Sequence, residues 1–266
     1  MLSSLCYVPE HVTPEIQSDA WVGHTPFAHW LINRVKPDIF VELGTHGGGS
    51  YFAFCDSVLR HDLKTQCHAV DTWKGDLQAG YYGDAVFNHV ESVNKSKFSK
   101  FSKLYRMTFD DALKEFDDGT VDLLHIDGFH SLEAVSHDFA TWRPKLTNDA
   151  LVLFHDTQVK KENFGVHKFW SHLCSTRKRS NFEFFHSHGL GVFCNNPDID
   201  FAKNYIPAGL SSNDFRGLFE MAGNRVVQQS SFKPKKMVTP DEVLHLVKVL
   251  SAKSEAHRQA IAQIVA

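Results

Sequence analysis

Paired cysteines, long apolar runs and an excess of positive charge are all missing from this chain of 266 residues. No stretch approaches the roughly 18 consecutive apolar residues of a membrane-spanning helix, so no membrane span is expected. The five cysteines are scattered and none forms a CxxC pair, which favours reduced thiols over a disulfide framework. The formal net charge of −3 argues against a general nucleic-acid binder, because such proteins are usually clearly basic.

The N-terminus also lacks the basic segment and the apolar core of a signal peptide, so a cytoplasmic protein is expected. An apolar content of 42% with 22% charged residues is ordinary for a globular chain that buries a substantial core. Strand and helix patterns alternate from about residue 24 to residue 200 and then stop. We therefore expect a lead segment (1–23), one main domain (24–200) and a C-terminal helical extension (201–266).

A glycine-rich turn between a strand and a helix is the central feature of the main domain. Residues 39–43 predict a short buried strand, Gly44 and residues 47–49 supply the turn, and residues 50–59 predict a helix. Glycine adopts positive φ angles and has no Cβ, so this backbone can turn sharply and approach a ligand closely. Ligands of open α/β sheets bind at such points, where free N–H groups and the helix dipole converge. A tight turn that binds nothing is the alternative.

Further strand and helix patterns predict the rest of the fold. Strands are expected over 65–71, 104–107, 121–127 and 150–154, and helices over 25–35, 110–116, 131–142 and 164–174. Residues 182–185 and 191–194 predict an antiparallel pair rather than another crossover. Helical patterns return over 215–221 and 238–264. The expected fold is α/β: a Rossmann-like open sheet, mostly parallel with an antiparallel final strand, plus a C-terminal helical appendage.

Carboxylates end several of the predicted strands: Glu42, Asp71, Asp127 and Asp156. The tips of parallel strands share one rim of the sheet. Carboxylates gathered on one rim would repel one another unless cations or hydroxyl groups are bound there, so together they favour a ligand site. Asp71 ends the second strand, where such folds hold a ribose, because a carboxylate accepts hydrogen bonds from two vicinal hydroxyls. For any one of these acids alone, capping of a helix is the simpler explanation.

Several segments support a resemblance to a known family. Residues 42–50, Glu-Leu-Gly-Thr-His-Gly-Gly-Gly-Ser, resemble motif I of class I S-adenosylmethionine-dependent methyltransferases, with the spacing of the catechol O-methyltransferase branch. Residues 126–130, Ile-Asp-Gly-Phe-His, and 154–157, Phe-His-Asp-Thr, are similar to metal-dependent sugar O-methyltransferases of macrolide biosynthesis. Residues 71–87 resemble a subgroup of these methyltransferases found beside glycosyltransferases. The resemblance covers about residues 24–195.

The resemblance implies an O-methyltransferase that moves a methyl group from S-adenosylmethionine to a hydroxyl. The implied acceptor is a sugar of a polysaccharide, a glycoconjugate or a glycosylated metabolite. The expected partners are this small-molecule or glycan acceptor and neighbouring glycosyltransferases, with no nucleic acid and no membrane span. A homo-oligomer contact through the C-terminal helix is a further expectation.

The resemblance also assigns site residues. The implied cofactor-binding residues are Glu42, Gly44, Thr45, His46, Gly48, Ser50, Asp71, Trp73, Asp110 and Asp127. His130 and Asp127 are the implied catalytic residues, with the imidazole as a base suited to neutral pH. A surface or helix-capping histidine is the alternative for His130.

A divalent metal is implied as a second cofactor, with Asp127, Asp156 and His155 as its ligands. Magnesium suits oxygen ligands, whereas a histidine ligand shifts the preference towards manganese. The cation would bind vicinal hydroxyls and lower the pKa of the one attacked. Related enzymes end this strand with two adjacent metal-binding side chains, whereas here His155 and Thr157 flank Asp156.

Two other classes of protein share part of this pattern. An NAD-dependent oxidoreductase would normally carry G-x-G-x-x-G, whereas here Gly44 is followed by three consecutive glycines at 47–49, and acids on the fourth and fifth strands have no role. A non-catalytic scaffold that binds a cofactor and presents its helical tail to a partner is the other alternative. The basic run from Lys95 to Arg106 indicates either a solvated face or a contact for an anionic acceptor.

Overall fold

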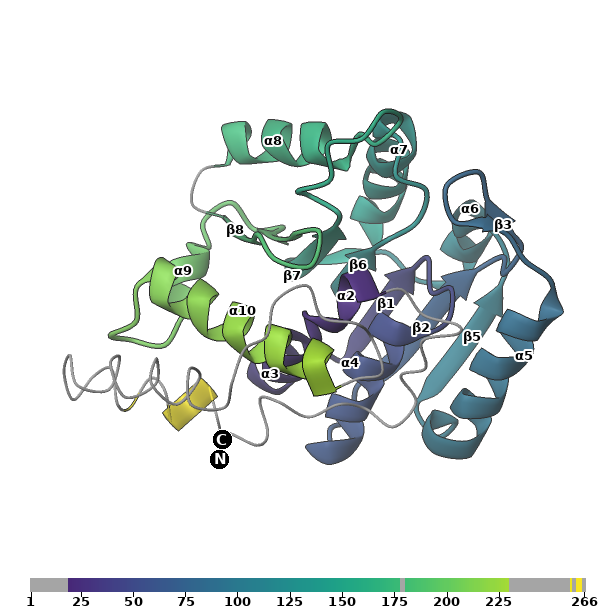
Figure 1. The fold of residues 1–266 in the computed structure, drawn as a ribbon, viewed down its shortest axis with the longest axis horizontal. Helices are drawn as coiled ribbons and strands as arrows, with labels where there is room; N and C mark the ends of the chain where they lie inside the picture. The colour runs from purple at the N-terminus through teal and green to yellow at the C-terminus, as the bar shows by residue number, and fades with distance from the viewer. Residues whose placement is uncertain (1–18, 178–179, 230–258, 260–261, 265–266) are drawn as a thin grey trace.

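The computed structural model describes residues 19–177, 180–229, 259 and 262–264. Within these residues seven strands form one sheet, and along the chain they are β1 (Ile39–Leu43), β2 (Gln66–Asp71), β5 (Ser102–Arg106), β6 (Val121–Ile126), β7 (Leu146–His155), β8 (Asn181–Phe184) and β9 (Leu190–Cys194). Their order across the sheet is β5-β2-β1-β6-β7-β9-β8 (Figure 1). A small separate hairpin follows β2 and consists of β3 (Gly75–Asp76) and β4 (Gly80–Tyr81).

The sheet is parallel from β5 to β7 and antiparallel beyond β7. β9 pairs with both β7 and β8, so it lies inside the sheet and β8 forms that edge. The predicted α/β class and the Rossmann-like, mostly parallel sheet with an antiparallel end are therefore confirmed. β1 pairs with β2 on one side and with β6 on the other, and the chain moves outward from these strands in opposite directions. Open α/β sheets bind their ligands at the carboxyl ends of the strands flanking such a switch in order.

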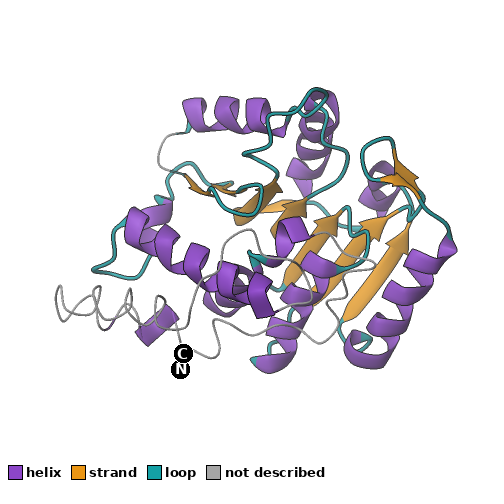
Figure 2. Cartoon of the chain, viewed as in Figure 1, coloured by secondary structure: helices purple, strands orange, loops and turns teal. Residues whose placement is uncertain are grey.

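Helices cover both faces of the sheet (Figure 2). The α-helices are α2 (Asp19–Val22), α3 (Thr25–Val35), α4 (Gly49–Arg60), α5 (Asp84–Val93), α6 (Phe109–Ala112), α7 (Leu132–Trp142), α8 (Val166–Thr176), α9 (Phe201–Asn204) and α10 (Ser212–Gln229). A π-helical turn covers Asn94–Phe98, and 3-10 turns cover Leu113–Glu115 and Arg143–Lys145. The helices predicted between residues 25 and 174 are found with small shifts at their ends, and the helix predicted over 215–221 is part of the longer α10. None of the described helices is long and apolar enough to span a membrane.

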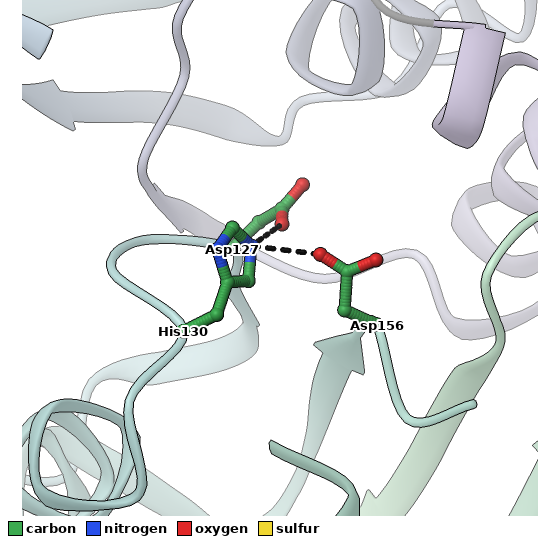
Figure 3. Close-up of side chains that lie close together, drawn as sticks. All are labelled: Asp127, His130 and Asp156. Atoms are coloured by element: carbon green, nitrogen blue, oxygen red, sulfur yellow. Dashed lines mark hydrogen bonds and ion pairs between the residues drawn. The ribbon is translucent and has the colours of Figure 1, made fainter. Parts of the chain in front are cut away.

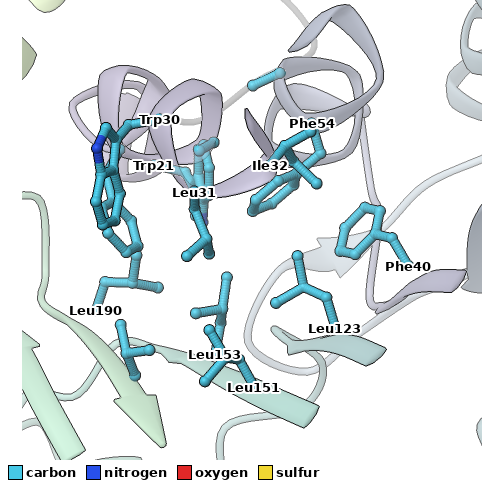
Figure 4. Packing of buried hydrophobic residues seen from close by; sticks show 14 of the residues in the cluster. Trp21, Trp30, Leu31, Ile32, Phe40, Phe54, Leu123, Leu151, Leu153 and Leu190 are labelled. Carbon is cyan, nitrogen blue, oxygen red and sulfur yellow. The ribbon is translucent and has the colours of Figure 1, made fainter. Parts of the chain in front are cut away.

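An apolar layer joins α3 and α10 to the sheet. Figure 4 shows Trp30 and Leu31 of α3 on the side that faces the strands carrying Leu153 and Leu190. The ring of Trp30 also contacts Phe215 of α10, with centroids 5.0 Å apart. Residues 201–229, expected to begin a helical extension, thus share the core of the sheet. The predicted domain boundaries stay predictions, and residues 1–18 and most of the predicted helix over 238–264 lie outside the described residues.

Candidate active site

A cavity of about 610 Å³ opens at the carboxyl ends of β1, β2, β6 and β7. Its wall combines the glycine turn after β1, the loop that carries the β3–β4 hairpin, and the segments that follow β6 and β7. The volume falls in the range of about 300–1,000 Å³ that is usual for small-molecule sites. The cavity therefore lies at β1, where the strand order reverses and where the sequence predicts a ligand site.

Two glycines of the turn are required by the backbone itself. Gly44 has a φ of +89°, and a Cβ there would lie 2.2 Å from the carbonyl oxygen of Asp127. Gly48 has a φ of +83°, and a Cβ there would lie 2.5 Å from the ring of Phe52. Gly44 lines the cavity and Gly48 does not. A branched side chain at position 48 would consequently disturb the turn and the Phe52 ring, so it is a poor probe of ligand binding.

The N-terminus of α4 faces the cavity. Gly49 and Ser50 begin this 12-residue helix and line the cavity, and among the described residues no side chain caps its N-terminus. The first amides of a helix have no partner within the helix, and the helix dipole adds partial positive charge there. The cavity wall thus offers N–H donors to the polar atoms of a ligand.

Asp71 ties the glycine turn to the end of β2. Its Oδ2 accepts hydrogen bonds from the backbone N–H groups of Thr45 at 3.0 Å and His46 at 2.8 Å. Its Oδ1 accepts the backbone N–H of Trp73 at 2.7 Å, and the Trp73 indole donates to the carbonyl of His46 at 2.8 Å. A carboxylate has about four acceptor positions, so Asp71 keeps one for a ligand hydroxyl in the cavity that it lines.

Glu42 lies beneath the cavity, in a buried chain of polar groups. Its Oε2 lies 2.8 Å from Nδ1 of His125, and the indole of Trp21 donates to Nε2 of His125 at 3.3 Å. The indole nitrogen is only a donor, so Nδ1 of His125 carries the hydrogen that bonds Glu42. Burial raises the pKa of Glu42, and the bond from His125 opposes that rise. Trp21 lines the cavity whereas Glu42 does not.

Asp127, His130 and Asp156 converge where β6 and β7 end (Figure 3). Nε2 of His130 lies 2.8 Å from Oδ2 of Asp156 and 3.4 Å from Oδ1 of Asp127. One ligand atom from each residue lies within 4.8 Å of the others, a spacing that could hold a metal ion. β6 and β7 are neighbouring parallel strands, which is why their terminal side chains meet.

The charges of this group are strongly coupled. Burial opposes the charge of His130, yet the hydrogen bonds that it donates to Asp127 and Asp156 raise its pKa to about 10. Burial alone would raise the pKa of Asp127 and of Asp156. The neighbouring His130 and His155 instead hold both pKa values well below the usual range. At neutral pH His130 is therefore an imidazolium between two carboxylates.

His155 sits behind this group. Its Nδ1 lies 3.3 Å from Oδ1 of Asp127, and its Nε2 bonds the carbonyl of Ser187 at 3.1 Å. Burial lowers the pKa of His155, but the carboxylate of Asp127 outweighs it and raises the pKa to about 9. His130, rather than His155, completes the compact set of three ligand atoms. Metal ligation by His155 stays a prediction.

The structure brings most of the predicted site residues to one cavity. Those that line it are Gly44, Thr45, His46, Ser50, Asp71, Asp127, His130, His155 and Asp156. Glu42, Gly48, Trp73 and Asp110 are not among the lining residues. Glu42 and Trp73 instead support the wall from behind, and the exposed Asp110 pairs with His137 at 2.9 Å.

Several residues of the site were not predicted from the sequence. Phe164 stacks on His130 with centroids 4.9 Å apart and an interplanar angle of 8°. Nδ1 of His188, in the turn between β8 and β9, lies 3.2 Å from Oδ1 of Asp156. Gln78, in the turn of the β3–β4 hairpin, bonds both the backbone and the ring of His130. Only Gln78 lies in a stretch that the sequence had already associated with the site, the glycine- and aromatic-rich residues 71–87.

The basic run over 95–106 contributes no residue to the cavity wall. Lys95 pairs with Glu91 at 2.9 Å and Lys103 with Glu115 at 3.5 Å. Arg106 pairs with Asp84. This placement favours a solvated face over a contact for an acceptor in the cavity.

Comparison with known proteins adds a family match. Residues 41–157 match the model of a family described as a methyltransferase domain. The chain is 41% identical over 218 residues to an uncharacterized protein, y4gI, of Sinorhizobium fredii. That match covers 80% of this chain and 23% of the relative, so the chain spans under a quarter of the relative's length.

Solved structures share the fold. A Staphylococcus aureus protein assigned as a caffeoyl-CoA O-methyltransferase superposes with a TM-score of 0.51 at 13% identity, over 64% of this chain and 81% of the other. A methyltransferase of Podospora anserina in its SAH-bound form gives a TM-score of 0.50 at 13% identity, over 64% and 76%. Residues 41–157 are thus similar to a methyltransferase domain, and the chain shares the Rossmann-like fold of these solved structures.

Proposed function

We propose that this chain transfers a methyl group from S-adenosylmethionine to a hydroxyl oxygen of a sugar, assisted by a divalent cation and by His130. One observation carries the proposal: the uncapped N-terminus of α4 and the group of Asp127, His130 and Asp156 line the same cavity. A cofactor site and a polar reaction site therefore adjoin. The sugar acceptor is supported by the resemblance of residues 71–87 and 126–130 alone.

The cofactor half of the cavity fits an adenosyl group with a charged amino-acid tail. The amides at the start of α4 would bind a carboxylate, and the remaining acceptor position of Asp71 would bind a ribose hydroxyl. Tyr82 and His46 line the cavity as a ring pair with centroids 5.0 Å apart and offer an aromatic wall. The carboxylates nearby suit a sulfonium cation, because opposite charges attract more strongly where water is excluded.

The reaction needs an aligned oxygen and a place for its proton. As the oxygen–carbon bond forms, the carbon–sulfur bond breaks, its electron pair stays on sulfur, and the hydroxyl proton leaves. Neutral His130 could accept this proton at Nε2, which faces the carboxylates of Asp127 and Asp156. Carboxylate and imidazole ligands fit a divalent cation, and such a cation would lower the pKa of a bound hydroxyl.

Asp71→Ala is expected to weaken S-adenosylmethionine binding at least tenfold, or about 1.4 kcal/mol. The substitution removes a hydroxyl acceptor and also releases the amides of Thr45 and His46, which Asp71 holds in place. Isothermal titration calorimetry measures the affinity. Asp118→Ala is the matched control, because Asp118 is an exposed carboxylate paired with Lys145. Equal affinity of a folded Asp71→Ala chain would refute this cofactor site, and NAD binding instead would favour an oxidoreductase.

A divalent cation held by Asp127 and Asp156 is expected to make His130 neutral while leaving it free to act as the base. Since the pKa of His130 is raised to about 10 by these two carboxylates, the metal-free site is protonated at pH 7. Binding of Mn²⁺ to the carboxylates should release about one proton and weaken as the pH falls, because the cation repels the imidazolium and takes its place beside them. Chelation should abolish transfer and leave cofactor affinity nearly intact.

Calorimetry in buffers of different ionisation enthalpy counts the released protons. Asp156→Asn should reduce the affinity for Mn²⁺ strongly, whereas Asp149→Asn, on an exposed part of β7, should not. Full transfer by a metal-stripped chain in EDTA would overturn the metal half of the proposal. A screen of nucleotide-sugar and oligosaccharide acceptors would identify the methylated hydroxyl. It stays a prediction that the chain acts together with glycosyltransferases. It also stays a prediction that it forms an oligomer through the C-terminal helix.

A further inference from the structure

We infer that Gln78 is a positioning residue that fixes the ring and the tautomer of His130, so that Nε2 is the nitrogen presented to the reacting groups. The inference rests on the proposed function for its consequence, and on the hydrogen bonds of Gln78 for its geometry. Gln78 lies between β3 and β4, far along the chain from the segment that carries His130.

Gln78 makes three hydrogen bonds that leave its amide a single orientation. Its Oε1 lies 2.9 Å from the backbone nitrogen of His130 and 2.9 Å from Nδ1 of the same residue. Its Nε2 donates to the carbonyl oxygen of Asn163 at 2.9 Å. A backbone N–H only donates and a backbone carbonyl only accepts, so the amide cannot be exchanged end for end. Oε1 is therefore the atom that faces the imidazole.

This orientation decides which ring nitrogen carries the hydrogen. Oε1 of Gln78 has only lone pairs to offer, so Nδ1 of His130 must be an N–H that donates to it. The opposite tautomer would place two lone pairs 2.9 Å apart. Nε2 faces Asp156 at 2.8 Å and carries a hydrogen while His130 is an imidazolium. When His130 becomes neutral, the lone pair is left on Nε2, because the hydrogen on Nδ1 stays bonded to Gln78. When Nε2 takes the proton of an acceptor hydroxyl, the bond to Gln78 is unchanged.

The hairpin that carries Gln78 is itself held in place. Oδ1 of Asp76 accepts the backbone N–H groups of Gln78 at 2.6 Å and Ala79 at 2.7 Å, which fixes the turn. Phe164, directly after Asn163, stacks on a face of the imidazole with ring centroids 4.9 Å apart. The hairpin thus contacts the ring at its Nδ1 edge, and the 163–164 segment contacts it on a face. Because Asp76 also lines the cavity, the same hairpin borders the cofactor space.

The first test observes the hydrogen on Nδ1 without any turnover. In the ¹H–¹⁵N spectrum of the full chain labelled on histidine, Nδ1–H of His130 should give a slowly exchanging downfield signal, identified by its loss in His130→Asn. Gln78→Ala should lose that signal. Gln78→Glu should keep it, because a carboxylate accepts the same two hydrogen bonds. Leu77→Ala, a neighbour on the hairpin whose side chain is 81% exposed, should also keep it.

The second test measures transfer. Gln78→Ala should lower kcat by about 10–100-fold, as is usual for partners that orient a reactive histidine, with cofactor affinity within about twofold. Gln78→Glu should recover part of that loss, and Leu77→Ala should match the parent chain. A retained Nδ1–H signal in Gln78→Ala would overturn the inference, as would an equal loss of kcat in Gln78→Glu and Gln78→Ala. Should the chain transfer no methyl group at all, the spectrum alone decides the role of Gln78, and only the proposed function fails.

Discussion

His130→Ala is expected to lower kcat for methyl transfer by about 10²–10⁴-fold, the usual contribution of a positioned base. Nε2 of His130 lies 2.8 Å from Asp156 and 3.4 Å from Asp127, so its removal also leaves two carboxylates without their shared cation. The cofactor half of the cavity is built by other residues. S-adenosylmethionine affinity should consequently stay within about twofold of the parent.

The pH dependence of transfer separates a base from a merely structural histidine. The pKa of His130 is raised to about 10, so in the metal-free chain the neutral form is scarce at pH 7. A bound cation lowers that pKa, so if neutral His130 takes the proton, the rate of the metal-loaded chain should rise about tenfold per pH unit up to the lowered pKa and then level off. His130→Ala should abolish this rise. His137→Ala, on the exposed face of α7, should preserve it. An unchanged profile in His130→Ala would leave a methyltransferase that works by alignment alone.

Much of the fold follows from patterns that the sequence carries locally. The run over 39–43 is buried on both faces of the sheet, so it is apolar apart from Glu42, and it becomes β1 with those bounds. Asp127 and Asp156 could be paired in advance because β6 and β7 are adjacent parallel strands whose tips share an edge. In these cases the order of the strands along the chain is enough to predict which residues lie close together.

The sequence is less informative where contact depends on the direction of a side chain or the path of a loop. Gly48 was expected to face the cofactor, but its missing Cβ points at Phe52 within α4. Asp110 was expected in the site, but at the start of α6 its carboxylate points outward to His137. Gln78 meets His130 across 52 residues of chain, through a hairpin whose path no periodicity encodes. The Trp21 indole likewise enters from a segment that carries no clear pattern.

The second large effect concerns stability rather than turnover. His125→Ala is expected to lower the free energy of unfolding by about 3–5 kcal/mol, because it removes a buried ring and leaves the buried carboxyl of Glu42 without its hydrogen-bond donor. Glu42 and His125 both have fully buried side chains, and Nδ1 of His125 lies 2.8 Å from Oε2 of Glu42. The substitution also removes the acceptor of the Trp21 indole. Urea denaturation of the full chain, followed by circular dichroism, measures the loss.

Controls and pH together distinguish an unpaired charge from a lost ring. His68→Ala removes a histidine from the adjoining strand β2, where the ring packs against Phe116 and Nδ1 has no hydrogen-bond partner, so it should cost less. Burial already raises the pKa of Glu42, and losing His125 should raise it further. An acid with a raised native pKa binds more protons folded than unfolded, so stability falls as pH rises from about 4 through that raised pKa. The deficit of His125→Ala should therefore grow with pH over this range.

The double variant Glu42→Gln with His125→Ala completes the argument. Removing the charge should recover a large part of the loss, because a buried neutral amide is less costly than a buried carboxylate without a partner. Recovery should come with a flat pH dependence, since no buried acid remains to titrate at this position. If His125→Ala loses under about 1 kcal/mol, or if Glu42→Gln adds to the loss instead of relieving it, the carboxylate is stabilised by groups other than His125. Trp21 would then be held in the cavity wall by its packing against Phe54, with ring centroids 5.5 Å apart, rather than by the buried polar chain.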